Sequence, residues 1–213
     1  MTDNCFEKYK PIYEYYNISS HQLEQLKEYK NLILHWNKKH NLISRKSEDD
    51  IWERHILNSL QLLDFIDTKN NINPIKTNLA SPTSRKIIDI GSGGGFPGII
   101  LNIMLPNDNI TLIDSCQKKI TTLNDIIDSL QLKNINTICD RIENIHLSCD
   151  IITARALASI PKILQLTHQI KHKKMLLLKG KSVHNEINKE LTKKCLIHQG
   201  KLDSLIIEIN SIS

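Results

Sequence analysis

The chain of 213 residues has no long apolar run, and this absence excludes a helical membrane span. A span needs about 20 consecutive apolar residues, whereas the longest run, around Gly98 to Leu105, is interrupted by Asn102. The first residues also lack the basic and apolar regions of a secretory signal and the Arg- and Ser-rich pattern of an organelle-targeting segment. We therefore expect a soluble, cytoplasmic protein.

Paired cysteines are also lacking. The five cysteines form no CxxC pair and no His/Cys cluster with the spacing of metal ligands. Their odd number and wide separation are typical of a reducing compartment, where free cysteines act as small buried hydrophobes. We expect no metal site and no catalytic role for these residues, which are Cys5, Cys116, Cys139, Cys149 and Cys195.

No strong charge imbalance is present, because the formal net charge is +5 and the pI is about 8.9. Such a value permits a polyanionic partner without requiring one. The cations do cluster just after Trp36, at Lys38, Lys39, His40, Arg45 and Lys46. Cations at the end of a solvated helix are also favoured by the helix dipole, so this cluster alone leaves both interpretations open.

The first third of the sequence has helical periodicity. Apolar residues recur at helical spacing from Ser20 to Trp36, and the pair Ser19 and Ser20 can supply an N-cap. A second helical pattern runs from Ile51 to Leu63 after three acidic residues, which suit a first turn. We expect residues 1–67 to form a helical segment and the polar stretch 68–85 to be a connection.

Strands and helices alternate from residue 86 onward. Strands are predicted at 86–90, 109–114, 135–139, 149–153 and 175–179, with one or two more between 195 and 209. Helices are predicted at 98–105, 116–130 and 159–170. This alternation indicates an α/β core, residues 86–213, with a parallel sheet built from right-handed crossovers.

Glycine is scarce, and five of the seven glycines fall within Asp89 to Gly98, in the sequence D-I-G-S-G-G-G-F-P-G. The segment lies between the first strand and first helix of the core, where open α/β sheets bind ligands. Glycines allow a tight turn and close approach of a ligand, and the following helix start favours an anionic group. A bare strand-to-helix turn would need only one or two glycines.

Two common nucleotide motifs do not fit this segment. The dinucleotide fingerprint GxGxxG requires glycine where Phe96 stands, and no Gly-Lys-Ser/Thr follows as in a P-loop. The remaining D-x-G-x-G pattern resembles the first motif of S-adenosylmethionine-dependent methyltransferases. We therefore predict that Asp89, Gly91 and Gly93 bind this cofactor, whose methionine carboxylate is the anion.

Asp114 ends the second predicted strand, about 20 residues after the glycines. A carboxylate at this position can accept hydrogen bonds from both ribose hydroxyls of a nucleoside. The same feature occurs in NAD-binding proteins, so Asp114 supports a nucleoside ligand without identifying it.

Further short motifs accompany the glycine segment at 89–98. They are W-N-K-K-H-N-L at 36–42, R-H-I-L-N-S-L at 54–60, L-I-D-S at 112–115, R-I-E at 141–143, A-R-A at 154–156 and L-K-G at 178–180. With these motifs the chain resembles the GidB (RsmG) family of bacterial 16S ribosomal RNA methyltransferases, which modify guanine N7 of the small-subunit RNA. The resemblance covers residues 34–181. It implies a Rossmann-like class I methyltransferase fold with a mostly parallel seven-stranded sheet.

The resemblance also implies particular cofactor contacts. These are Gly91 and Phe96, Ile142 and Glu143, and Arg155. Apolar side chains at 96 and 142 can contact the nucleoside, and the carboxylate at 143 can accept hydrogen bonds. The chain departs from the family at Asn58, where Asp is usual, and at Ile43, where Thr is usual.

No catalytic nucleophile is assigned. Guanine N7 has a lone pair in the plane of the base, so it can attack the methyl group directly, and alignment of the reactants accounts for catalysis. After the fourth strand stands Thr153-Ala154-Arg155-Ala156, which resembles neither the Pro-Pro-Tyr motif of amino-group methyltransferases nor the Pro-Cys motif of cytosine-C5 enzymes.

RNA contacts are expected mainly from cations, because Lys and Arg bind phosphates. Trp36 can stack on a base, but its spacing with Ile33 fits a core position better, and His55 fits a packed helix residue better than a catalyst. The expected partner is small-subunit ribosomal RNA or an assembling subunit, bound by a monomer. The expected contacts are Lys38, Lys39, Arg45, Arg54, His55, Lys118, Lys119, Lys179 and Lys181.

Two other functions remain open from the sequence. One is a methyltransferase acting on a small molecule, and the other is an inactive, cofactor-binding assembly protein. The basic helical N-terminal third favours RNA over a small metabolite, because a small substrate needs a lid rather than a charged surface.

Overall fold

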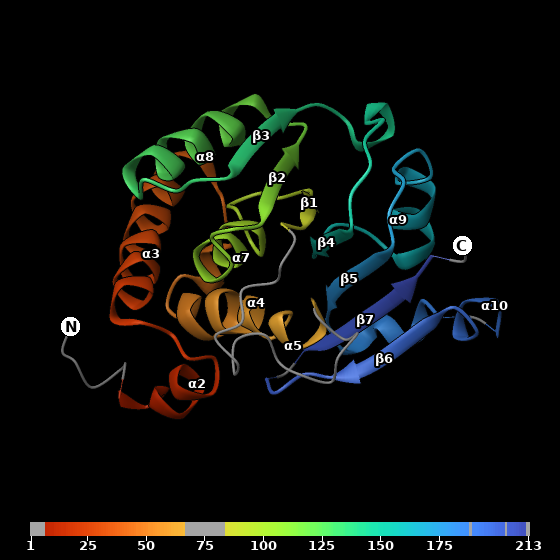
Figure 1. The fold of residues 1–213 in the computed structure, drawn as a ribbon, viewed down its shortest axis with the longest axis horizontal. Coiled ribbons are helices and arrows are strands. Elements are labelled where there is room, and N and C mark those ends of the chain that lie inside the picture. Colours follow the sequence, from red (N-terminus) through yellow and green to blue (C-terminus); the bar gives the residue numbers. More distant parts are fainter. Residues whose placement is uncertain (1–6, 67–83, 188, 203, 212–213) are drawn as a thin grey trace.

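The computed structural model describes residues 7–66, 84–187, 189–202 and 204–211, and its centre is one seven-stranded sheet (Figure 1). The strand order is β3-β2-β1-β4-β5-β7-β6. Strands β1 to β5 are parallel, whereas β7 pairs antiparallel with both β5 and β6. The bounds are β1 Lys86–Ile90, β2 Asn109–Asp114, β3 Ile135–Cys139, β4 Ile151–Arg155, β5 Lys174–Lys179, β6 Cys195–Gln199 and β7 Leu205–Asn210.

This sheet confirms the expected α/β fold. The strong β-branched and apolar content of the central strands suits a sheet that is covered on both faces, and alternate residues of these strands bury into two separate clusters. Ile87 belongs to the cluster beneath α3 Ser20–His40, α7 Gly98–Met104 and α8 Gln117–Ser129. Ile88 belongs to the cluster beneath α9 Ile160–Leu166.

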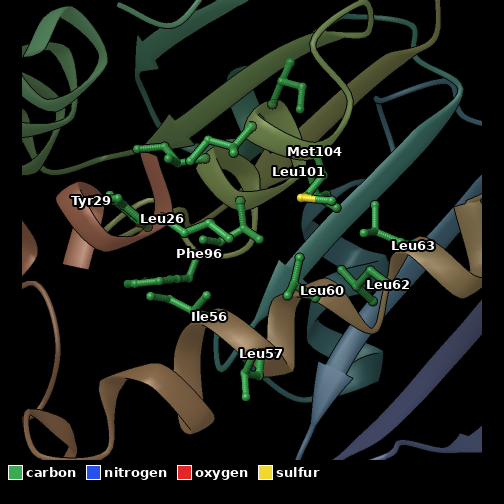
Figure 2. Close-up of a cluster of buried hydrophobic side chains, with 14 of the residues drawn as sticks. Leu26, Tyr29, Ile56, Leu57, Leu60, Leu62, Leu63, Phe96, Leu101 and Met104 are labelled. Atoms are coloured by element: carbon green, nitrogen blue, oxygen red, sulfur yellow. The ribbon is translucent and has the colours of Figure 1, made fainter. Parts of the chain in front are cut away.

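The expected N-terminal helix forms as α3. Ser19 caps it in a capping box with Gln22, and Asn41 ends it in the left-handed conformation with φ 47°. Leu26, Tyr29 and Ile33 of α3 are fully buried and share one hydrophobic cluster with α7. Figure 2 shows how side chains from these distant segments meet. The N-terminal helices and the sheet are therefore packed around a shared core.

The second expected helix is interrupted. A π-helix, η2 Trp52–Leu57, is followed by the short α4 Asn58–Leu60 and by α5 Leu63–Ile66. The N–H of Asn58 donates to the carbonyl of Glu53, five residues earlier, which widens the helix. Single π-turns often occur at functional sites, and this one borders the site described below.

Other boundaries differ by a few residues. Strand β4 begins at Ile151 rather than Cys149, because Cys149 N–H donates to the carbonyl of Lys171 in a separate bridge region. Helix α9 ends at Leu166, four residues before the expected end. A short helix, α2 Lys10–Tyr15, lies within the segment 1–67 that was expected to be helical, although its bounds were not predicted. The remaining short elements are η1 Arg45–Ser47, η3 Ile142–Asn144, η4 Lys181–Asn185 and α10 Lys189–Thr192.

The connection expected at 68–85 lies almost wholly outside the described residues, as does Cys5. Within the described part of the chain, no helix combines the length and apolar character that a membrane crossing requires.

Candidate active site

The glycine segment forms a loop between β1 and α7, as the sequence predicts. Gly91 has φ +65°, a conformation that L side chains rarely adopt. A Cβ atom at Gly91 would lie 2.4 Å from Cδ1 of Leu157, so the loop runs close to the chain that follows β4. Glycine at this position therefore satisfies both a backbone and a packing requirement.

Hydrogen bonds hold this loop from two sides. Ser92 N–H donates to the carbonyl of Ile113 at 3.0 Å, and the Ser92 hydroxyl donates to the carbonyl of Asp89 at 2.8 Å. From above, the buried Tyr29 hydroxyl of α3 donates to the carbonyl of Gly94 at 2.6 Å. The loop is thus fixed both to the sheet and to the N-terminal helix.

Asp89 lies beneath the loop and is fully buried. Its carboxylate accepts hydrogen bonds from Gly98 N–H at 3.2 Å and from the Thr153 hydroxyl at 3.1 Å. Burial raises the pKa of Asp89 to about 7, although these bonds act in the opposite direction. Asp89 was expected to contact the cofactor, but its position makes it a support of the loop.

Asp114 lies at the carboxyl end of β2, beside the glycines. One carboxylate oxygen accepts from Gly93 N–H at 3.0 Å, and the other accepts from Cys116 N–H at 2.9 Å. The Lys119 ammonium lies 4.0 Å from the first oxygen. A carboxylate has about four lone-pair sites, so Asp114 retains acceptor capacity for a ligand hydroxyl.

A cavity of about 340 Å³ opens at this end of the sheet, a size within the usual range for small-ligand sites. Four of the predicted cofactor residues are not among its described lining residues: Asp89 lies beneath the loop, Asp114 lies beside it, Ile142 is buried in the cluster on the α9 face, and Glu143 is exposed on η3. The described residues that line the cavity are Leu42, Ile43, Ser44, Ser47, Arg54, His55, Gly91, Ser92, Gly93, Gly94, Phe96, Lys119, Arg155 and Ala156.

Phe96, His55 and Arg155 pack together at one wall. The Phe96 and His55 ring centroids are 4.9 Å apart, and the Arg155 guanidinium carbon lies 5.9 Å from the Phe96 centroid. Figure 2 shows Phe96 among Leu26 and Tyr29 of α3 and Ile56 of η2. The aromatic residue after the glycines is thus built into the core under the cavity.

His55 is neutral and serves as an acceptor. Burial, reinforced by the charges of Arg155 and Arg54, lowers the pKa of His55 to about 3. Nη1 of Arg155 donates to Nδ1 of His55 at 2.5 Å, and Nη2 donates to the carbonyl of Arg54 at 3.0 Å. The proton of His55 is therefore on Nε2, which has no hydrogen-bond partner among the described residues.

A second cavity, of about 1010 Å³, adjoins the first. Residues 155–158, 178–180 and 199–202 line it from the carboxyl ends of β4 and β5 and from the β6–β7 turn, and Asn58 and Arg54 line it from the N-terminal helices. Arg54, Arg155 and Ala156 border both cavities. Ala156 has φ +50°, an uncommon value for a non-glycine residue and typical of functional turns.

Asn58 keeps an acceptor where the family usually has Asp. Its Oδ1 accepts from the Ser204 hydroxyl at 2.7 Å and from Gln61 Nε2 at 2.9 Å. Both bonds need only an oxygen acceptor, which Asn and Asp share. The departure at this position is therefore compatible with the local structure.

The expected RNA-contacting cations divide into two groups. His55 and Lys179 lie inward: His55 packs against Phe96, and the Lys179 ammonium bonds Glu186 at 2.9 Å and the carbonyl of Ala158. Lys119 is half-buried beside Asp114. The exposed members are Lys38, Lys39, Arg45, Arg54, Lys118 and Lys181.

Sequence reasoning missed several residues of the site. Tyr29 had no signal beyond helical spacing, because its contact with Gly94 spans 65 positions. Leu42, Ile43, Ser44 and Ser47 follow α3 and reach the glycine loop only through tertiary packing. The only sequence signal for this part of the site was the motif at 36–42, which ends at Leu42.

The sheet order, the glycine loop after β1 and the acidic end of β2 define the fold of class I S-adenosylmethionine-dependent methyltransferases. Solved structures agree at the level of the fold. A mutant of MtNAS in complex with S-adenosylmethionine has a TM-score of 0.54 at 12% identity, covering 91% of this chain and 72% of that chain. A ribosomal protein methylase from Lactobacillus delbrueckii subsp. bulgaricus has a TM-score of 0.53 at 11% identity, covering 74% and 78%.

The chain belongs to the GidB family, described as rRNA small subunit methyltransferase G, which it matches over residues 22–209. "Ribosomal RNA small subunit methyltransferase G" of Orientia tsutsugamushi strain Ikeda is 37% identical over 190 residues, 84% of this chain and 88% of that protein. The protein of the same name from Rickettsia bellii strain OSU 85-389 is 37% identical over 197 residues, 90% of this chain and 94% of that protein. These matches confirm the family resemblance drawn from the motifs.

Proposed function

We propose that the protein transfers the methyl group of S-adenosylmethionine to N7 of a guanine in small-subunit ribosomal RNA. The main support for this proposal is that two cavities meet at Arg155 in a chain that belongs to the GidB family. The smaller cavity has the size and donor set for a nucleoside cofactor, and the larger one is open and polar. A base in the larger cavity would lie beside a ligand in the smaller one.

The glycine loop and Asp114 form the cofactor site in this proposal. Backbone N–H groups of the loop suit the methionine carboxylate, and the free lone pairs of Asp114 suit ribose hydroxyls. Gly91, Gly93 and Phe96 border this cavity directly, while Asp89 supports the loop from below. When bound, S-adenosylmethionine supplies an electrophilic methyl group.

The residues of the larger cavity suit direct attack by N7. Its described lining residues include neither a cysteine nor a histidine, so the cavity offers no thiolate nucleophile of the kind that cytosine-C5 methylation uses. N7 needs no proton removed before it attacks. The contribution of the chain is then to align the base with the methyl group and to stabilise the charge that develops on the imidazole ring.

The exposed cations near the glycine loop form the proposed RNA surface. Lys38 and Lys39 end α3, and Lys118 begins α8; the two helices are joined by a 2.6 Å bond between His40 Nδ1 and the Thr122 hydroxyl. The half-buried Trp36 stacks on His40 with ring centroids 5.5 Å apart. Phosphate binding by this surface makes RNA affinity dependent on salt.

The test is a methylation assay on small-subunit RNA that lacks the modification. Labelled S-adenosylmethionine is incubated with this RNA, either naked or in particles, and N7-methylguanine is mapped by borohydride and aniline cleavage. We expect cleavage at one guanine. Label in base amino groups alone, or in a small molecule, would contradict the N7 assignment, and absence of any label transfer would favour an inactive assembly protein.

We also propose that the protein acts as a monomer in the cytoplasm, where small subunits assemble. A membrane or metal is not part of the proposed mechanism. Light scattering on the purified protein, with and without cofactor, tests the oligomeric state.

A further inference from the structure

The wall that the N-terminal helices contribute to the larger cavity carries a carboxylate with no assigned role. Asp50, Arg54 and Asn58 line this wall at intervals of four residues, and Arg54 N–H donates to the carbonyl of Asp50 at 2.8 Å. Asp50 lies in the turn that leads into the π-helix η2, and this backbone bond joins it to Arg54 across a single turn of the chain. Asp50 is therefore about one turn from the junction of the two cavities, which Arg54 marks.

The other two carboxylates of the cavity already have partners. Oε2 of Glu186 accepts from Ile160 N–H at 2.8 Å and from the Lys179 ammonium at 2.9 Å. Oε1 of Glu53 accepts from the Lys8 ammonium at 2.6 Å and from the Tyr9 hydroxyl. Among the described residues, Asp50 is the lining carboxylate whose side chain forms no bond, and it is exposed to the cavity.

The chemistry of N7 methylation limits how a guanine can be recognised. Arg and Lys usually read guanine through O6 and N7, but that contact would occupy the lone pair that must attack the methyl group. Recognition must then come from the opposite edge, where guanine presents two donors, N1–H and the 2-amino group. A carboxylate accepts both at once, whereas adenine presents an acceptor at N1.

We propose that the larger cavity receives the target guanine and that Asp50 accepts hydrogen bonds from N1–H and the 2-amino group of the base. This inference rests on the proposed N7 methylation. Asp50 selects guanine over adenine, and it leaves N7 directed toward the cavity that Gly91 and Phe96 border. Arg54 and Arg155 border both cavities, so they lie where the methyl group would pass from the cofactor to the base.

The experiment compares Asp50→Asn with Asp49→Asn. Asp49 is the adjacent exposed carboxylate and borders neither cavity, so it is matched in charge and location. With unmethylated small-subunit particles, D50N is expected to lower kcat/KM roughly 10- to 100-fold, because an amide N–H then faces two donors. D49N is expected to match the wild type, and both variants are expected to bind S-adenosylmethionine with unchanged affinity by calorimetry.

Nucleotide inhibitors test the contact itself. GMP, IMP, which lacks the 2-amino group, and AMP are titrated into the same assay. The wild type and D49N are expected to bind GMP most tightly, then IMP, then AMP, whereas D50N loses this order. Glu53→Gln, a change at another carboxylate of the same cavity, is titrated alongside. The role of Asp50 would be overturned if D50N keeps the order of the three nucleotides, or if the order is lost only in Glu53→Gln.

The failure of this inference differs from the failure of the proposed function. If D50N behaves like D49N while N7-methylguanine is formed, the role of Asp50 is wrong and the proposed function stands. If the wild type forms no N7-methylguanine, the proposed function is wrong. Calorimetry of GMP and AMP binding then still shows whether guanine preference depends on Asp50.

Discussion

Asp89 links the stability of the site to pH. A carboxyl whose pKa rises on folding contributes most to stability below its ordinary pKa, and this contribution is lost as pH rises through its folded value. For Asp89 the window runs from the ordinary value of 3.8 to about 7. The buried negative charge above pH 7 is therefore a cost that the fold tolerates to keep Gly98 and Thr153 in place.

Asp89→Asn is expected to remove this pH dependence. Asn is neutral and still offers an oxygen to Gly98 N–H, while the Thr153 hydroxyl can accept from the amide. The stability of the variant relative to wild type should rise between pH 5 and pH 8, on the order of 1.4 kcal/mol for each pKa unit crossed. Urea unfolding at the two pH values measures this, and parallel curves for both proteins would contradict the raised pKa.

The neutral His55 orients a charged partner. His55→Ala leaves the Nη1 donor of Arg155 without its acceptor, whereas His55→Gln can restore an acceptor oxygen. Loss of a hydrogen bond to a charged group costs about 1.5 to 3 kcal/mol. We expect roughly tenfold weaker cofactor binding by calorimetry in the Ala variant and partial recovery in the Gln variant. Equal affinities in all three proteins would show that His55 does not position Arg155.

At the scale of elements, the glycine loop depends on backbone freedom at one position. Gly91→Ala adds a Cβ within 2.4 Å of Leu157 and forces an L residue to φ +65°, which costs about 1 to 2 kcal/mol. Cofactor affinity should fall at least tenfold, and the unfolding temperature should fall by several degrees. Gly180→Ala is the matched control, because a Cβ there meets nothing within 4 Å. Equal losses in both variants would contradict the importance of the loop.

The elements of the core could be predicted because their signals are local. Strands 86–90, 109–114 and 135–139 have apolar runs bounded by turn residues, and their observed limits agree with the prediction. The glycine loop and Asp114 follow from the same local pattern. The parts of the site that a short pattern encodes were therefore accessible from the sequence.

The remaining features depend on contacts between distant residues. The π-turn at Trp52–Leu57 has the apolar spacing of an ordinary helix. Arg155 donates to the carbonyl of Arg54, 101 positions away, and no local pattern reports such a bond. The inward positions of Lys179 and Asp89 likewise depend on burial, since their residue types indicate surface or ligand contact.

At the scale of the whole molecule, exposed cations are found at both ends of the sheet. The exposed cations of α3 and α8 lie at the end of the sheet that carries the glycine loop. Lys173 lies at the opposite end, before β5, and pairs with Asp150 at 2.6 Å. This separation allows a direct test of which face binds RNA.

Lys39→Ala and Lys118→Ala are each expected to weaken RNA binding and to reduce the slope of log affinity against log salt by about one. Lys173→Ala is the control and should leave the slope unchanged. Filter binding of small-subunit RNA over a range of salt concentrations measures all three. A slope that changes only in Lys173→Ala would place the RNA on the other face.

The β6–β7 turn completes the larger cavity with residues from the last fifteen positions of the chain. Gly200, Lys201 and Ser204 face a wall made by the first third of the sequence, and Lys201 is held by Asp64 at 2.7 Å. A chain that is still being synthesised has the cofactor loop long before it has this wall. In the order of synthesis, the larger cavity therefore acquires its full lining later than the cofactor loop does, because one of its walls comes from the β6–β7 turn.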